Sequence, residues 1–377
     1  MNNLYFDIAA TTPLDHDVSK LITEIQNTVF GNPSSIHQFG QKSRSLIEKA
    51  RRQMAKSLNC KPSELIFTGG GSESNNLILK GFLKKGDHLI TSSYEHPAIA
   101  KVAQELENHG VEITYIKPNA DGIIHVNDIE SAIKKNTTLI SIMYVNNELG
   151  CINPISDIIK MAKQNDIKIH TDAVQLIGKQ PFDLNSLNVD FLSIAPHKYY
   201  GPKGIGALFI RSGNLLNSIF QGGGQEKNIR PGTENISGIV GMGLATEKAI
   251  KDVEKNSKKI LELEELFIKK LNENNIRYKV NGKYRIPGIL NITFPNILGQ
   301  TLVMKLDLNG VAVSFGSACS SGTPKPSKVL LNLGLSDEEA LRTIRISIGK
   351  FHTKDDINNL ANILSTILYK ECEKDLA

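Results

Sequence analysis

The sequence predicts an α/β protein whose larger part is built on a mainly parallel sheet, and two observations support this. Between about residues 42 and 254, short apolar runs alternate with segments that have helical spacing. Further along the chain, a long charged amphipathic pattern leads into a mixed α+β pattern. We therefore expect a domain boundary near residue 254.

The apolar runs have the length and composition of buried strands. They are ELIFT at 64–68, DHLITS at 87–92, VEITYI at 111–116, TLISIMYV at 138–145, IKIHT at 167–171, DFLSIA at 190–195 and GALFI at 206–210. Before them, Leu46, Ala50 and Met54 recur at helical spacing, which predicts an amphipathic helix over residues 41–59. The charged amphipathic pattern predicts another long helix over residues 254–275.

The composition excludes several classes of protein. A hydrophobic content of 40% and a charged content of 22% are typical of a soluble globular chain. The net charge of +5 is too small an excess to predict stable nucleic-acid binding. No apolar run approaches the roughly 18 residues of a membrane helix, and the N-terminus lacks a signal-peptide pattern. We therefore expect a cytoplasmic protein.

The cysteines suggest neither a zinc site nor a disulfide framework. Four are present, and none belongs to a CxxC pair. They are Cys60, Cys151, Cys319 and Cys372. Cys319 lies in a segment rich in Ser, Gly and Pro, about residues 314–327, which predicts an exposed loop. An accessible thiol can act as a nucleophile once it is ionised. The alternative interpretation is that Cys319 is an incidental cysteine in a loop.

Lys198 is a candidate catalytic residue because it directly follows a predicted strand and precedes glycine-rich backbone. Burial lowers the pKa of a lysine, and the neutral amine can condense with an aldehyde. Taken alone, the segment is more typical of an ordinary surface lysine in a basic loop.

Further polar residues follow other predicted strands, and the carboxyl ends of parallel strands meet at one edge of a sheet. Asp172 could pair with a pyridine nitrogen or cap a helix. The glycines at 69–71 could cradle a phosphate at a helix N-terminus or form an ordinary turn. His96 could stack on an aromatic ring or serve as a loop residue, and Asn147 could contact a ligand or form a turn.

Ten segments, taken together, identify a family. They are FDIAATTP, FGNPSSIHQFGQ, TGGGSESNN, EHPA, VNNELG, HTDAVQ, HKYYGPKGIGAL, RPGTEN, GSACSSG and RISIGKF. In this order and spacing, over about residues 4–353, they resemble the NifS/IscS-type cysteine desulfurases, pyridoxal 5'-phosphate enzymes of the class V aminotransferase group. The resemblance implies fold type I of the pyridoxal-phosphate-dependent transferases, with a seven-stranded, mainly parallel sheet and a smaller α+β domain. It also implies a homodimer. The large domain would span residues 16–255, and the small domain would combine residues 1–15 with residues 256–377 and carry the cysteine loop.

The resemblance also implies roles for individual residues. Lys198 would bind the cofactor aldehyde, Cys319 would take the sulfur, and His96 would stack on the ring and move protons. Cofactor binding would further involve Gly71, Ser72, Asp172, Gln175 and His197, with Thr233 contributed by the neighbouring subunit. Asn147 and Arg345 would hold the substrate carboxylate. No resident metal is implied, only a transient contact of Cys319 with an iron–sulfur cluster.

The implied reaction removes sulfur from L-cysteine, leaving L-alanine and a persulfide on Cys319 for an acceptor or scaffold protein. The long cysteine segment resembles the long-loop members of the family. Iron–sulfur cluster assembly is the first expectation for the sulfur, with tRNA or DNA thiolation as alternatives. A selenocysteine lyase, another class V aminotransferase-like enzyme and a non-enzymatic sulfur-relay scaffold are the rival functions. Ala195-Pro196 departs from the family, which usually has a phosphate-binding serine and then a small residue before the histidine.

Overall fold

The computed structural model describes residues 4–316 and 325–374, with side chains up to residue 371. At its centre lies a sheet that has seven strands within these residues, in the order β2-β8-β7-β6-β5-β3-β4. The strands are β2 (Leu65–Thr68), β3 (His88–Ser92), β4 (Glu112–Ile116), β5 (Thr137–Ser141), β6 (Lys168–Asp172), β7 (Phe191–Ile194) and β8 (Gly206–Ile210). β8 pairs antiparallel with β2 and β7, and the other neighbouring pairs are parallel. The predicted sheet and all its predicted strands are confirmed, with ends shifted by a few residues.

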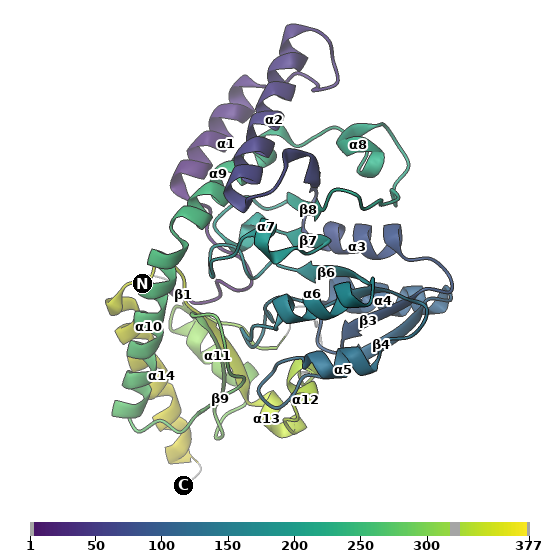
Figure 1. Ribbon diagram of the computed structural model, residues 1–377. Coiled ribbons are helices and arrows are strands. Elements are labelled where there is room, and N and C mark those ends of the chain that lie inside the picture. Colours follow the sequence, from purple (N-terminus) through teal and green to yellow (C-terminus); the bar gives the residue numbers. More distant parts are fainter. Residues whose placement is uncertain (1–3, 317–324, 375–377) are drawn as a thin grey trace.

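Helices cover both faces of this sheet because its strands are apolar on both sides. On β8, Leu208 packs with α3 (Gly71–Phe82) and α4 (Pro97–Asn108). Its neighbours Ala207 and Phe209 point to the opposite core. The longer helices that contribute to that core include α1 (His16–Thr28), α2 (Gln38–Leu58), α6 (Ile155–Gln164) and α9 (Ile236–Lys251), together with the short α7 (Leu184–Leu187). Figure 1 shows α1, α2 and α9 together at the upper left, beyond the end of the sheet that holds β8.

A second, smaller sheet lies in the C-terminal part of the chain. It has the order β12-β10-β9, and both neighbouring pairs are antiparallel. The strands are β9 (Lys279–Val280), β10 (Ile289–Thr293) and β12 (Thr343–Ser347). They share a core with α10 (Val253–Glu273), α11 (Gly299–Leu308) and α14 (Lys354–Lys374), and Figure 1 shows α10 beside α14. The long helix expected over residues 254–275 is therefore confirmed as α10.

The N-terminal segment joins the C-terminal part of the fold. β1 (Leu4–Tyr5) pairs in parallel with β11 (Val311–Ala312), and the Phe6 ring stacks on His352 with their centroids 4.3 Å apart. In the other direction, Leu330 and Leu335 pack into the core of the large sheet. The two parts thus share apolar contacts, and their division at residues 15 and 255 stays a prediction.

The remaining elements are short. They are α5 (Val126–Ser131), α8 (Gln225–Ile229), α12 (Lys328–Asn332), α13 (Asp337–Leu341) and the 3-10 turns η1 (Pro62–Glu64) and η2 (Pro196–Lys198). None of the helices in the described part of the chain combines the length and the apolar character that a membrane span requires.

Candidate active site

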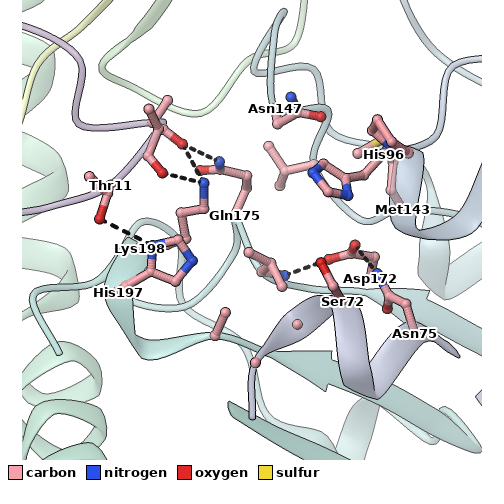
Figure 2. Close-up of a pocket in the computed structure, with 18 of the residues that line it drawn as sticks. Thr11, Ser72, Asn75, His96, Met143, Asn147, Asp172, Gln175, His197 and Lys198 are labelled. Carbon is pink, nitrogen blue, oxygen red and sulfur yellow. Dashed lines mark hydrogen bonds between the residues drawn. The ribbon is translucent and has the colours of Figure 1, made fainter. Parts of the chain in front are cut away.

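A pocket of about 740 Å³ lies at the carboxyl edge of the large sheet, where β3, β6 and β7 end. Most of the residues that the sequence predicts for the site line it. They are Gly71, Ser72, His96, Asn147, Asp172, Gln175, His197, Lys198 and Arg345. Figure 2 shows that Lys198, His96 and Asp172 enter the pocket from different sides. The parallel strand order brings these side chains together although they lie far apart in the sequence.

Lys198 enters the pocket from η2, the 3-10 turn that follows β7. Pro196 occupies the first position of this turn, where its ring suits the backbone angle and its missing N–H is not needed. The Nζ atom of Lys198 donates to the carbonyl oxygens of Ala9, at 2.9 Å, and Ala10, at 2.6 Å. Burial and the nearby positive charge of Arg345 lower the pKa of Lys198 to about 8. A substantial fraction of this amine is therefore neutral near neutral pH.

Asp172 ends β6 with its carboxylate 6% exposed. Its Oδ1 accepts from the Val174 backbone N–H at 3.0 Å, and its Oδ2 accepts from the Asn75 side-chain amide at 2.7 Å. The carboxylate therefore caps the following turn, and Asn75 of α3 fixes its orientation. This cap does not exclude a contact with a pyridine nitrogen, the other role considered from the sequence.

His96 lies at the N-terminus of α4, where its Nδ1 accepts from the Ala98 backbone N–H at 3.1 Å. With Nδ1 acting as an acceptor, a neutral ring carries its hydrogen on Nε2. Burial lowers the pKa of His96, and the positive charge of Lys198 acts in the same direction. The neutral imidazole can therefore accept a proton without first losing one, and it can deliver that proton afterwards.

The N-terminus of α3 forms one end of the pocket, at Gly71 and Ser72. The first N–H groups of a helix have no partner within the helix, so they are available to an anion. A Cβ atom at Gly71 would lie 2.9 Å from Cγ2 of Val174, so a side chain there would not fit without rearrangement. On the neighbouring turn, His197 contacts the Thr11 hydroxyl at 3.2 Å, and burial lowers the pKa of His197 to about 4.

Gln175 lies beside Lys198, and its Nε2 donates to the Ala9 carbonyl oxygen at 2.8 Å. The Oε1 atom of Gln175 accepts from the amine of Lys179. These two partners assign the orientation of the amide, because one requires the nitrogen and the other the oxygen. One N–H of Gln175 remains for a ligand in the pocket.

Arg345 comes from β12 of the small sheet and is 6% exposed. Its Nη1 donates to the Asn147 carbonyl oxygen at 2.8 Å, and its Nη2 donates to Oδ1 of Asp7, also at 2.8 Å. Its Nε is buried and has no partner among the described residues. Arg345 lines the pocket, and a guanidinium suits a carboxylate ligand.

Two predicted residues are not found in the pocket. Thr233 is exposed and lines a neighbouring cavity of about 70 Å³, with Gly69 and Gly204 common to both cavities. Its predicted contribution to the neighbouring subunit stays a prediction. Cys319 lies outside the described residues, as does most of the predicted cysteine loop, and the structure describes only its flanks up to Gly316 and from Lys325.

Several residues of the site were not singled out from the sequence. Asp7 and Asn75 bind Arg345 and Asp172, and Ala9 supplies an acceptor for both Lys198 and Gln175. Glu95 lines the pocket next to His96 and is fully buried. Burial raises the pKa of Glu95 to about 8, so this carboxyl is mostly protonated at pH 7. Each of these residues lies within a recognised segment, but their partners come from distant parts of the chain.

Comparisons with known proteins show which family the whole chain resembles. The family described as "Aminotransferase class-V" matches residues 4–360. A cysteine desulfurase IscS from Dictyoglomus turgidum is 44% identical over 373 residues, which cover 97% of this chain and 95% of that protein.

Solved structures have the same fold. A NifS-like protein superposes with a TM-score of 0.91 at 34% identity, covering 97% of this chain and 99% of the other. SspA in complex with cysteine superposes with a TM-score of 0.82 at 38% identity, covering 93% of this chain and 100% of the other.

Proposed function

The chain belongs to the class V aminotransferase family, among relatives that are cysteine desulfurases, and from this premise we propose that it removes sulfur from L-cysteine. L-Alanine leaves as the product, and the sulfur remains as a persulfide on Cys319. The observation that carries the proposal is the Lys198 amine with its lowered pKa, in one pocket with Asp172, His96 and Arg345.

The residues of the pocket fit pyridoxal 5'-phosphate. Such a cofactor needs an amine for its aldehyde, a carboxylate for its ring nitrogen and hydrogen-bond donors for its phosphate. Lys198 and Asp172 would provide the first two, His96 would stack on the ring, and Gln175 would donate to the phenolic oxygen. Phosphate binding is assigned to Gly71, Ser72 and His197, together with Thr233 of the neighbouring subunit in a homodimer. When bound, the cofactor supplies an electron sink for negative charge at the substrate Cα.

The protein side chains then have defined tasks. Arg345, aided by Asn147, would hold the substrate carboxylate and thereby orient the Cα–H bond. The Lys198 amine would move the α-proton, and His96 would take part through its Nε2.

Cys319 acts on the sulfur. Its thiolate would form a bond to the substrate sulfur while the carbon–sulfur bond breaks, and the electron pair of that bond stays with the substrate carbon. A proton then completes alanine.

The destination of the sulfur is part of the proposal. We expect an acceptor protein to take it from Cys319, and iron–sulfur cluster assembly is the destination that the IscS-named relatives favour. A homodimer in the cytoplasm is the expected setting. Support for the dimer comes from the exposed position of Thr233, which does not line its own pocket.

The decisive experiment measures alanine released from L-cysteine by the purified protein with added pyridoxal 5'-phosphate. Cys319→Ala should retain the cofactor absorbance at about 400 nm but lose alanine formation. Cys60→Ala is the matched control, since Cys60 does not line the pocket, and it should keep wild-type activity. Unchanged turnover in Cys319→Ala would refute the assigned nucleophile, and a wild-type protein without cofactor absorbance would refute the function.

A further inference from the structure

Arg345, which lines the pocket, forms an ion pair with Asp7. Oδ1 of Asp7 lies 2.8 Å from Nη2 of Arg345, and the two side chains are 18% and 7% exposed. The Ser314 hydroxyl accepts from the same Nη2 at 3.2 Å. Arg345 thus has one carboxylate bound before any substrate arrives, and its Nε is left without a partner among the described residues.

The backbone on both sides holds this pair in place. Asp7 forms a parallel bridge with Ser347, two residues beyond Arg345, and the Ser347 N–H donates to the Phe6 carbonyl oxygen at 2.7 Å. Arg345 and Ser314 exchange backbone hydrogen bonds of 2.8 and 3.1 Å. With the two backbones fixed, the Asp7 carboxylate cannot leave the guanidinium without a change of rotamer.

The pair sets the charge that a substrate meets. Charges interact more strongly in a half-buried site than in water, because the effective dielectric constant is lower. The pKa of Lys198 responds to both residues: Arg345 lowers it and Asp7 raises it. Asp7 already offsets the charge of Arg345, so a substrate with a second negative group meets a less positive pocket than it would without Asp7.

We propose that Asp7 is a specificity residue that makes the pocket select amino acids with an uncharged side chain over those with an acidic one. The inference rests on the proposed function, since it assumes that the substrate carboxylate binds Arg345. A thiol side chain passes this selection, and a carboxylate of similar size does not.

The test uses a ligand pair that differs in one charge. L-Asparagine and L-aspartate have nearly the same shape. Each is titrated into the cofactor-loaded protein while the absorbance at about 400 nm is followed. Wild-type protein should bind L-asparagine more tightly. In Asp7→Asn the ratio of the two dissociation constants should shift by about tenfold towards L-aspartate, while Asp7→Glu should keep the wild-type preference.

Controls separate this role from a purely structural one. Asp15→Asn removes a carboxylate from the same N-terminal segment, where it pairs with Lys248 and Lys350 and not with Arg345. Its ratio should stay at the wild-type value. If Asp7→Asn does not fold, Asp7→Ser removes the same charge and takes its place.

Two results would overturn the inference. One is a ratio of the L-aspartate and L-asparagine dissociation constants that, in the variant without the Asp7 charge, stays within twofold of the wild-type ratio. The other is the absence of L-aspartate binding to that variant. L-Alanine, the expected product, serves as the positive ligand. A wild-type protein that is colourless or does not respond to L-alanine would instead refute the proposed function, and the inference with it.

Discussion

Lys198 and Gln175 donate to the same acceptor, the carbonyl oxygen of Ala9, at 2.9 and 2.8 Å. This acceptor belongs to the N-terminal segment, far from both residues in the sequence. Figure 2 shows the shared contact at one side of the pocket. The N-terminal segment therefore holds the lysine and the amide beside each other in the absence of a ligand.

Lys198→Ala should remove the covalent attachment of the cofactor and lower cysteine turnover by about 10³-fold or more, because no other group replaces the amine. After borohydride reduction, mass spectrometry should find the pyridoxyl group on the peptide that contains Lys198. Lys203→Ala is the control, since Lys203 also lines the pocket and should leave the attachment intact. Attachment that persists in Lys198→Ala would contradict the assignment.

The rate at which the cofactor-free protein takes up pyridoxal 5'-phosphate should rise with pH through the pKa of Lys198, about 8. The reacting form is the neutral amine, whose fraction grows from roughly one-tenth at pH 7 to roughly nine-tenths at pH 9. Stopped-flow absorbance measures this rate. Asp7→Asn removes a carboxylate that raises the pKa of Lys198, so its midpoint should lie at lower pH. A midpoint above pH 10 would indicate an ordinary lysine.

Glu95→Gln should stabilise the protein at pH 8 by about 1 kcal/mol or more and have little effect near pH 4. Burial raises the pKa of folded Glu95 from 4.5 to about 8, so the folded chain binds a proton that the unfolded chain releases. The wild-type free energy of unfolding therefore falls as pH rises from about 4.5 to 8, and the loss is complete above pH 8.

Gln retains the acceptor that Ser92 and the Met143 N–H use, so the comparison isolates the proton. Denaturant titrations across this pH range provide the measurement. A stability difference that does not vary with pH would disprove the assignment of a protonated Glu95.

Glu226→Ala should cost about 3–5 kcal/mol of unfolding free energy. Glu226 and Arg51 form a buried bidentate pair with contacts of 2.6 and 2.9 Å, and the Phe67 N–H donates to the same carboxylate at 2.8 Å. In the variant, the Arg51 charge stays buried, and the contact with Glu48 is the ion pair that remains to it. Urea denaturation measures the loss.

The surface variant Asp157→Ala is the matched control. It breaks the exposed pair with Lys160 and should cost less than about 1 kcal/mol. Equal losses in the two variants would mean that burial does not matter at Glu226.

Ala195→Ser should tighten cofactor binding by about tenfold or more, because the new hydroxyl can donate to the phosphate and a hydrogen bond to a charged group is worth roughly 1.5–3 kcal/mol. Ala195 lines the pocket and is 1% exposed, next to the turn that carries Lys198. Equilibrium dialysis gives the dissociation constant. A value within twofold of wild type would show that Ala195 is not the position that weakens phosphate binding.

The strands and long helices were predictable because each is encoded locally. The apolar runs at 64–68 and 206–210 became β2 and β8, and the helical spacing of Ala50 and Met54 became the buried face of α2. The periodicity of a single segment reports its burial, whatever the segment packs against. Lys198, Asp172 and His96 were predictable for a related reason, since each follows a strand whose end lies at the same sheet edge.

The pairings within the site could not be read from any local pattern. Asp7 meets Arg345 across 338 residues, and Asn75 meets Asp172 across 97 residues. The first pair forms because β1 joins β11, and the second forms because α3 packs near β6. Both pairs therefore depend on strand register and helix packing rather than on neighbouring residues. The amino-acid pattern thus established which groups are present and which ends of strands carry them. The folded chain alone assigns their partners, since a hydrogen bond or an ion pair depends on distances that only packing sets.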